Sequence, residues 1–281
     1  MNINKHDFVL EIGSGDNPNS RADILCDRFI TTNHERAGGF RIRIDRPMVV
    51  ADGMRLPFRD QTFDYVIASH IFEHMDDPIG FAREIMRVGK AGYIEVPSAI
   101  SERVFGWDFH HWYSALHDGV LTLTPKKEGE RFNGFFHRLI ARALWFRRCF
   151  EEDEGKWYVR LEWEKKIPMR VRLRPMSHDE MNVLDEKAWK LLAQAKPEVL
   201  KDLVFGIRFF IRRVIRKSRK LVRSVLWWLN KRTDLFKLII CPRCHGNLLL
   251  RQGKMECGKC KIDYAIGGVI PILLSSCEAF F

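Results

Sequence analysis

Short apolar runs alternate with polar and helix-like segments over the first hundred residues. Each run ends in glycine or a polar residue, which is typical of strands buried inside a parallel sheet. Ile79, Ala82 and Ile85 have helical spacing and predict a helix over 79–88. The alternation of strand and crossover predicts a doubly wound, mostly parallel α/β sheet that binds ligands at the carboxyl ends of its strands. The predicted strands are residues 8–12, 22–27, 48–52, 63–69 and 91–97.

Beyond residue 107 the pattern is mixed. Residues 111–124 predict a hairpin that turns at Asp118-Gly119. Residues 135–150 predict one helix, and the alternation over 157–163 predicts a strand with which residues 169–173 pair. We divide the chain into a first domain, a helical and basic amphipathic segment, and a small cysteine module. These units are residues 1–176, with a core at 8–100 and a mixed accessory region at 101–176, then residues 177–235 and residues 236–281.

The positive charge of the chain is concentrated in one segment. The net charge is +11, from 47 Lys and Arg against 36 Asp and Glu. Residues 203–233 contain ten basic residues and no acidic one, so the remainder is close to neutral. This distribution argues against a nucleic-acid binder that is basic over its whole surface. The ten residues are Arg208, Arg212, Arg213, Arg216, Lys217, Arg219, Lys220, Arg223, Lys231 and Arg232.

The basic segment is also amphipathic. Apolar residues recur at helical spacing over residues 203–229, basic residues occupy the opposite face, and Trp227 and Trp228 lie near the end. Such a helix can lie on an anionic membrane surface, bind RNA phosphates, or pack its apolar stripe on the core of its own chain. The lack of acidic residues in this segment favours binding to a membrane surface. The near-neutral charge of the rest of the chain argues against binding to RNA. The three interpretations remain open.

Several features predict a cytoplasmic location. The amino terminus has no basic region followed by an apolar run, so no signal peptide is visible. No apolar run reaches the roughly 18 residues of a membrane span. Seven cysteines without a secretion signal suggest a reducing compartment. We expect a cytoplasmic protein, peripheral at the inner face of the membrane if its basic helix binds lipid. The solitary Cys26, Cys149 and Cys277 are expected to be small buried hydrophobes.

A glycine motif, Glu11-Ile12-Gly13-Ser14-Gly15, ends the first predicted strand. A dinucleotide site needs a third glycine and a helix N-terminus for the pyrophosphate. Here the third position is Pro18, and too few residues precede the next strand for a crossover helix. S-adenosylmethionine carries no phosphate, and its hydroxyls and amine suit carboxylate acceptors. Asp27 and Asp52, at the ends of the second and third strands, are placed for the ribose and for the adenine amine.

The motif and three further strings together resemble the class I S-adenosylmethionine-dependent methyltransferases, in particular the type 11 group. The further strings are Ala51-Asp52-Gly53-Met54-Arg55-Leu56-Pro57-Phe58, Phe63-Asp64-Tyr65-Val66 and Glu73-His74. The resemblance covers residues 8–100 and implies a Rossmann-like methyltransferase sheet. It also implies that Asp52 and Met54 hold the adenine and that Ser69 and His70 lie near the methionine end. The cofactor-binding residues expected on these grounds are Glu11, Gly13, Ser14, Gly15, Asp27, Asp52, Gly53, Met54 and Ser69.

The residues after the fourth strand narrow the choice of methyl acceptor. Ser69-His70-Ile71-Phe72 stands where a base-amine methyltransferase has an Asn-Pro-Pro-aromatic or Asp-Pro-Pro-aromatic tetrad, and a Pro-Cys nucleophile for cytosine C5 is lacking. Oxygen, ring nitrogen and protein side chains remain as acceptors. An alcohol needs a base, and His70 and His74, four residues apart or one helical turn, are the candidates. The alternative to a catalytic role is that Glu73-His74 is a structural feature of a helix. His110-His111-Trp112 can also face the substrate, and the spacing of these histidines is not diagnostic of a metal.

Four cysteines form two knuckles near the carboxyl end. Cys241-Pro-Arg-Cys244 and Cys257-Gly-Lys-Cys260 are separated by twelve residues, a spacing that predicts a closed, structural zinc site. Residues 236–275 resemble the small zinc-ribbon activator subunit of tRNA, rRNA and release-factor methyltransferases. The resemblance implies that this module docks on a methyltransferase domain, which here lies in the same chain. A ribbon for another partner is the alternative.

These observations lead to one expected function and two alternatives. We expect an S-adenosylmethionine-dependent methyltransferase that O-methylates a glycan, a lipid-linked sugar or another cell-envelope intermediate at the cytoplasmic membrane face. The zinc ribbon motivates the first alternative, an RNA or translation-factor methyltransferase with a fused activator module. The second alternative is a non-catalytic scaffold that binds the cofactor.

Overall fold

The computed structural model describes residues 1–30, 41–127, 135–230 and 234–274, except for the side chains of residues 216, 217, 219–221 and 223–230. Cys277, Lys231 and Arg232 lie outside the described residues, as do the side chains of Trp227, Trp228 and the five basic residues from Arg216 to Arg223.

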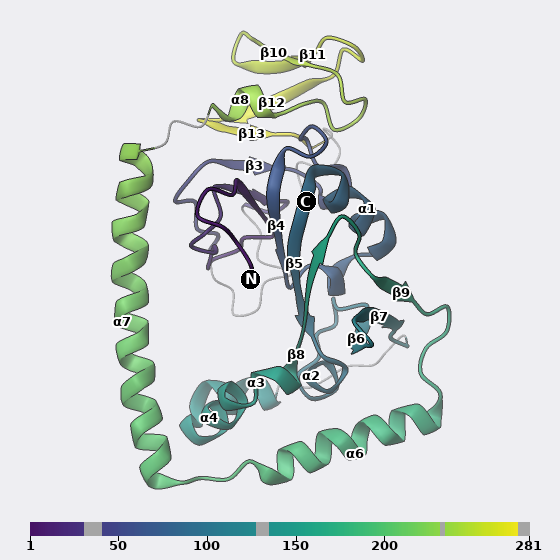
Figure 1. Cartoon of the computed structure of the whole chain (residues 1–281), viewed down its shortest axis with the longest axis vertical. Coiled ribbons are helices and arrows are strands. Elements are labelled where there is room, and N and C mark those ends of the chain that lie inside the picture. Colours follow the sequence, from purple (N-terminus) through teal and green to yellow (C-terminus); the bar gives the residue numbers. More distant parts are fainter. Residues whose placement is uncertain (31–40, 128–134, 231–233, 275–281) are drawn as a thin grey trace.

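Five parallel strands form the centre of the fold, in the order β3-β2-β1-β4-β5 (Figure 1). The strands predicted from apolar runs are confirmed, and every residue of β1, β2 and β3 is buried. The parallel register pairs Ile12 with both Cys26 and Ala68, so the carboxyl ends of these strands meet at one edge. The strands are β1 Val9–Ile12, β2 Ile24–Asp27, β3 Met48–Val50, β4 Phe63–Ser69 and β5 Gly89–Pro97.

Helix α1 (Pro78–Val88) connects β4 to β5 and confirms the predicted helix. It begins where Asp77 accepts a hydrogen bond from the backbone N–H of Gly80 at 2.8 Å, with Pro78 in the first turn. Its apolar face buries residues such as Phe81 and Ile85. The connection from β1 to β2 contains no helix, because residues 13–23 form a loop.

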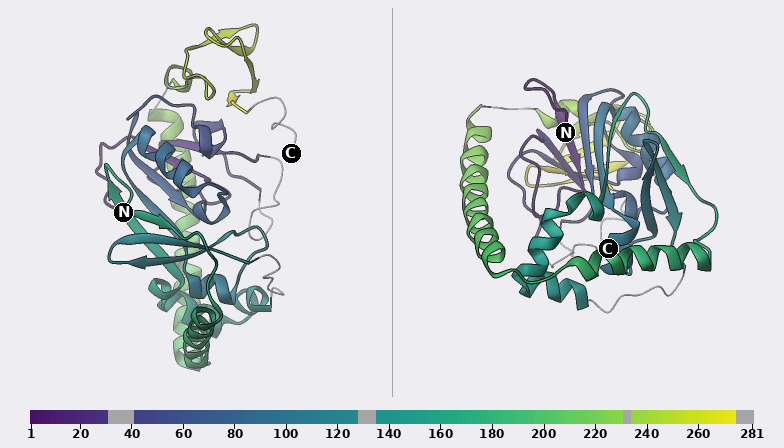
Figure 2. Two further views of the ribbon diagram at one scale, coloured as in Figure 1. Left: turned by 90° about the vertical axis from the view of Figure 1, so that its right-hand side faces the viewer. Right: turned by 60° about the horizontal axis from the view of Figure 1, so that its bottom comes forward.

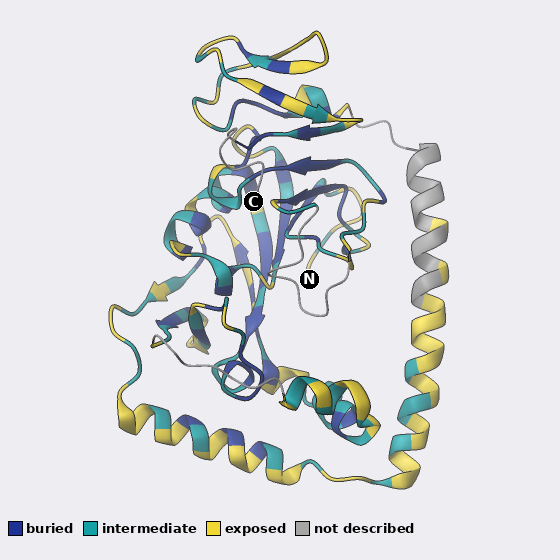
Figure 3. Cartoon of the chain, turned by 180° about the vertical axis from the view of Figure 1, so that it is seen from behind, coloured by how far each residue is buried: buried dark blue, intermediate teal, exposed yellow. Residues whose placement is uncertain are grey.

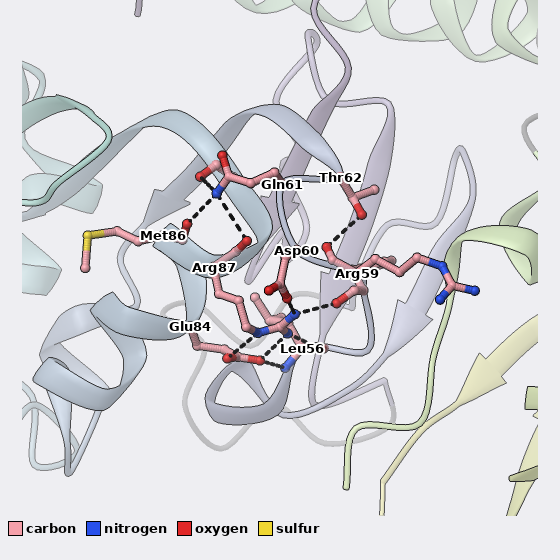
Figure 4. Close-up of polar contacts among 10 residues, drawn as sticks. Leu56, Arg59, Asp60, Gln61, Thr62, Glu84, Met86 and Arg87 are labelled. Carbon is pink, nitrogen blue, oxygen red and sulfur yellow. Dashed lines mark hydrogen bonds and ion pairs between the residues drawn. The ribbon is translucent and has the colours of Figure 1, made fainter. Parts of the chain in front are cut away.

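Arg87 ties the end of α1 to the loop between β3 and β4 (Figure 4). Its guanidinium donates to the carbonyls of Phe58 at 2.7 Å and Leu56 at 2.8 Å, and to the carboxylates of Asp60 and Glu84. The planar guanidinium of Arg87 thus fixes residues 56–58 of this loop. The cysteine module contacts the same loop through Ile240.

The cysteine module continues the central sheet beyond β3. Strand β13 pairs with β3 in parallel through Ile272 and Val50, and the Leu273 N–H donates to the Val50 carbonyl at 2.7 Å. The Ile240 N–H donates to the carbonyl of Pro57 in the adjacent loop at 2.9 Å. Figure 1 shows the module stacked on the end of the sheet. Its elements are α8 Leu235–Leu238, β10 Leu248–Arg251, β11 Lys254–Cys257, β12 Asp263–Gly267 and β13 Ile270–Ile272.

The accessory region adds an antiparallel strand and a small second sheet. Strand β8 (Tyr158–Glu164) pairs with the free side of β5. The predicted hairpin is confirmed as β6 (Trp112–His117) and β7 (Val120–Pro125). The expected pairing of residues 169–173 with β8 is wrong. The chain turns away at Lys165, and β9 (Met169–Val171) joins β7 in parallel instead.

The single helix expected over 135–150 is also wrong. Ala143 has extended backbone angles and separates α3 (Phe135–Arg142) from α4 (Leu144–Glu152). The break lets Phe136 and Phe146 stack, with ring centroids 6.2 Å apart. These rings join an apolar cluster that includes residues of α2 (Ala99–Val104), α5 (Glu154–Trp157) and α6 (His178–Gln194).

Helices α6 and α7 (Val199–Asn230) form two sides of a frame around the sheet (Figures 1 and 2). Arg148 of α4 fixes their corner. It is buried and donates to the carboxylate of Asp202 at 2.6 Å, to Glu152 at 2.9 Å and to the carbonyl of Lys196 at 3.1 Å. Helix α7 then runs up to the cysteine module. Over the described residues, neither α7 nor any other helix is long and apolar enough to cross a membrane.

Candidate active site

A cavity of about 1550 Å³ opens at the carboxyl ends of the parallel strands. The accessory region forms its other wall, and Arg212 and Ile215 of α7 reach its rim. The residues expected from sequence to bind the cofactor and the two expected catalytic histidines all line this one cavity. They are Glu11, Gly13, Ser14, Gly15, Asp27, Asp52, Gly53, Met54, Ser69, His70 and His74. Their individual roles stay predictions.

The loop after β1 needs glycine at two positions. Gly13 has a φ of 68° and Gly15 a φ of 53°, both in the left-handed region that glycine adopts readily. A Cβ on Gly13 would also lie 1.8 Å from Cδ1 of Ile71. The Gly13 N–H donates to the Cys26 carbonyl at 2.8 Å, and the Gly15 N–H to the Asp27 carboxylate at 3.2 Å. These bonds hold the loop against β2.

Two carboxylates organise this loop. Glu11 is buried, and its side chain accepts a hydrogen bond from the backbone N–H of Asn19 at 2.6 Å. Asp27 accepts from the backbone of Gly15 and, at 3.0 Å, from that of Phe29. Both carboxylates line the cavity, and a carboxylate accepts hydrogen bonds from ligand hydroxyls and amines.

A third carboxylate and an unpaired hydroxyl complete this side of the cavity. Asp52 caps the 3₁₀ turn η2 (Gly53–Arg55) by accepting from the Met54 N–H at 2.9 Å, and Arg28 lies 3.6 Å from its other oxygen. The Ser14 hydroxyl is buried without a hydrogen-bond partner in the described part of the chain. Carboxylate acceptors and a spare hydroxyl fit a ligand with hydroxyls and amines, which is the chemistry of S-adenosylmethionine.

The expectation that His70 and His74 share one helical turn is wrong. His70 follows β4 with a φ of 58°, and the chain then forms only the 3₁₀ turn η3 (Phe72–His74). Its Nδ1 lies 3.2 Å from Glu73 and its Nε2 3.6 Å from Glu95. Burial opposes protonation of His70, but the hydrogen bond and charge of Glu73 and the charge of Glu95 raise its pKa above the usual value.

His74 has a different environment. Its ring stacks on Phe109, with centroids 5.5 Å apart, and meets His110 edge-on at 4.8 Å. Burial is the main cause that lowers the pKa of His74 to about 4, so its ring is neutral near pH 7. Its Nδ1 is buried and without a hydrogen-bond partner among the residues described. The two histidines therefore differ in the direction of their pKa shifts and in their partners.

The sequence reasoning missed Glu102 and Lys126. Glu102 is buried in α2 and lies 2.6 Å from Nδ1 of His110, and the ammonium of Lys126 lies 2.8 Å from its other oxygen. No local pattern marks this group, because its members come from three segments that only the fold brings together.

The four cysteines of the module come together as their spacing predicts. Their Sγ atoms lie within 4.8 Å of one another, with Cys241 3.6 Å from Cys260 and Cys244 3.4 Å from Cys257. Tetrahedral Zn²⁺ with bonds of about 2.3 Å separates its thiolates by about 3.8 Å, so the cluster fits this ion.

The two knuckles repeat one backbone conformation. His245 and Lys261 both have positive φ values, of 55° and 60°. Each donates its N–H to the carbonyl of the first cysteine of its knuckle, Cys241 at 2.8 Å and Cys257 at 3.0 Å. Such turns direct both thiols of a knuckle to one side, which gives a closed site with four protein ligands.

We predict that Gly13→Ala lowers the free energy of unfolding by about 2–4 kcal/mol, because the new Cβ combines left-handed strain with a collision at Ile71. Urea unfolding measures the change. Gly119→Ala is the matched control, since Gly119 has a φ of 74° but open space around it. It should cost only about 1–2 kcal/mol, from left-handed strain alone. An equal loss of unfolding free energy in the two variants would contradict a collision between the new Cβ and Ile71.

A metal held by the four cysteines should stabilise the whole protein. We expect Cys244→Ser, or treatment with a chelator, to lower the thermal midpoint by at least about 5 °C, since each kcal/mol shifts a protein of this size by about 2–4 °C. Calorimetry measures the midpoint. Cys149→Ser is the control, because Cys149 lies outside the four-cysteine cluster. An unchanged midpoint in Cys244→Ser would argue against a structural metal.

Comparison with known proteins finds matches to part of the first hundred residues. Residues 25–94 match the family model described as a methyltransferase domain, Methyltransf_11. Two similar proteins are demethylmenaquinone methyltransferases. That of Streptomyces griseus is 30% identical over 88 residues, and that of Corynebacterium urealyticum is 46% identical over 57 residues. These matches cover 30% and 20% of this chain, and the chain spans only 38% and 24% of the relatives' lengths.

Similar solved structures share little sequence with this chain. A complex between the Haloferax volcanii Trm112 methyltransferase activator and a putative methyltransferase is 16% identical, covers 50% of this chain and 78% of that chain, and has a TM-score of 0.31. A methyltransferase from Methanosarcina mazei is 16% identical, covers 41% and 69%, and has a TM-score of 0.29. Together with the parallel sheet described above, the match over residues 25–94 shows an α/β Rossmann-like methyltransferase fold.

Proposed function

We propose that the protein transfers the methyl group of S-adenosylmethionine to an oxygen of its acceptor. The observation that carries this proposal is the single cavity that collects the glycine loop, the three carboxylates and the residues after β4. S-adenosylmethionine supplies a methyl group on a positively charged sulfur. Asp27 accepts hydrogen bonds from the ribose hydroxyls and Asp52 from the adenine amine, while Ser14 has a hydroxyl to spare.

The acceptor enters from the accessory side of the same cavity. Of the two expected catalytic histidines, His70 is held between two carboxylates, whereas His74 keeps an unpaired ring nitrogen. Phe109 and Trp107 stack beside His74, with centroids 5.2 Å apart, and offer a flat apolar wall. We therefore place the reacting oxygen of the acceptor near His74. Such aromatic surfaces suit the apolar faces of a sugar ring or another flat acceptor.

For the acceptor we propose a glycan, a lipid-linked sugar or another cell-envelope intermediate at a membrane surface. Support comes from α7, whose apolar stripe stays uncovered: Leu203 is 59%, Ile207 55% and Ile211 50% exposed. Figure 3 shows this exposed stretch of α7. The other side of the helix packs on α4, where the Arg147 guanidinium lies 5.1 Å from the centre of the Phe209 ring.

Charge supports a lipid surface for this stripe. Arg208, Arg212 and Arg213 are exposed beside it, and residues 203–230 contain no acidic side chain. A helix with an apolar face and flanking basic residues binds anionic interfaces by burying the apolar side chains while each basic residue adds about 1 kcal/mol. An RNA or translation-factor acceptor and a non-catalytic scaffold are the alternatives that the experiments below separate.

We predict that Asp52→Ala weakens binding of S-adenosylhomocysteine at least tenfold, because the variant loses a charged acceptor worth about 1.5–3 kcal/mol. Isothermal titration calorimetry measures the affinity. Asp263→Ala, on the exposed side of β12, serves as the control. Unchanged affinity in Asp52→Ala would remove Asp52 from the cofactor site. Cofactor binding without turnover in the presence of cell extract would favour the scaffold.

We also predict that the protein sediments with anionic phosphatidylglycerol vesicles at physiological salt. Replacing Leu203, Ile207 and Ile211 with serine should reduce the bound fraction at least fivefold, because the stripe loses most of its apolar area. Trp189→Ala is the control, since Trp189 is 72% exposed on α6. Release of the protein from vesicles by RNA, with a steep dependence on salt, would favour the RNA alternative.

A further inference from the structure

A second cluster of metal-binding side chains lies in the cavity, apart from the cysteines. We propose that Glu73, His74 and His110 bind a divalent transition-metal cation. Each of the three offers one ligand atom, and these atoms lie within 4.8 Å of one another. Glu73 and His74 belong to the turn η3 after β4, whereas His110 comes from the segment before β6. The fold therefore assembles the set at the junction of the sheet and the accessory region.

Two atoms of this cluster are buried without partners. Glu73 is 1% exposed, and its Oε1 lies 3.2 Å from His70, but its Oε2 accepts no hydrogen bond within the described ranges. The same holds for Nδ1 of His74. A buried polar atom without a partner costs about 1–3 kcal/mol, and more for a charged group. A cation bound between the two would satisfy both atoms at once.

His110 is oriented as metal-binding histidines usually are. Its Nδ1 lies 2.6 Å from the carboxylate of Glu102, which is 2% exposed and is itself held by Lys126 at 2.8 Å. A neutral imidazole that donates Nδ1–H to a carboxylate keeps the lone pair on Nε2. Glu102 is thus a positioning residue that fixes the ring and leaves Nε2 to bind the cation. The pairing of carboxylate, histidine and metal recurs in metal sites of known function.

The ligand set indicates which cation fits and what it can do. Two imidazole nitrogens and one carboxylate oxygen suit zinc, iron or nickel better than magnesium or calcium, which prefer oxygen ligands. Three protein ligands also leave a coordination position open, unlike the complete four-cysteine cluster. On the proposed methyl transfer, that position would hold the acceptor oxygen near the residues after β4.

Zinc stoichiometry tests the site in the full-length protein. Metal-free protein is titrated with ZnSO₄, passed through a desalting column and analysed for zinc and protein. We expect about two equivalents in the wild type, one for each cluster. Glu73→Gln, His74→Ala and His110→Ala should each retain about one. His111→Ala should retain both, because His111 lines the same cavity but lies outside the cluster.

Cobalt absorption distinguishes the two sites, even if a variant folds poorly. The first equivalent of Co²⁺ should show the thiolate charge-transfer band of the cysteine site, and a second equivalent should bind to the wild type without adding to that band. Glu102→Gln should weaken this second equivalent about 10–100-fold while far-ultraviolet circular dichroism stays unchanged.

Two results would overturn the proposal: one equivalent of zinc in the wild type, or a second equivalent that survives both histidine substitutions. Binding of S-adenosylhomocysteine is measured on the same samples. Retained cofactor binding alongside a missing second metal would reject the metal site and leave the proposed methyl transfer standing. If the wild type bound two equivalents of zinc but no S-adenosylhomocysteine, the proposed methyl transfer would be rejected and the metal site would stand.

Discussion

The main-chain pairing between β13 and β3 covers the edge of the parallel sheet beside the cavity. Strand β3 is short and fully buried, so its backbone polar groups need partners. The N–H of Leu273 donates a hydrogen bond to the carbonyl of Val50, and Asp52 follows two residues later in the chain. The four cysteines hold the other end of the same module together. The cysteine cluster, the sheet edge and the placement of Asp52 therefore depend on one another.

The local parts of this architecture could be predicted from sequence. Continuous apolar runs indicate the buried parallel strands, Asp77-Pro78 starts α1, and the two cysteine pairs form knuckles whose geometry needs few contacts from elsewhere. The residues of the glycine loop and the ends of β2 and β3 were expected to meet because parallel strands end at a common edge. These predictions rest on short-range patterns.

The parts that failed depend on contacts between distant segments. The break at Ala143 serves an aromatic cluster assembled from several helices, and β9 finds its partner in β7 only after the chain turns away from β8. The helical spacing of His70 and His74 was misleading, because His70 has a left-handed backbone conformation and only a 3₁₀ turn follows it. Residues 25–94, which the family model covers, supply one wall of the cavity. The accessory region, which lies beyond these residues, supplies the opposite wall.

Helix α7 has a consequence for how the cysteine module stays in place. The module pairs with β3 through Ile272 and Val50, and Ile240 donates a hydrogen bond to Pro57 in the loop after β3. Here α7, 32 residues and about 48 Å long, leads from the corner at α6 to the module. Because the module and the sheet belong to one chain, the effective concentration of the module at the sheet edge is high. Every molecule of the protein is also made with its module in a fixed one-to-one ratio, independent of how much of any second protein the cell produces.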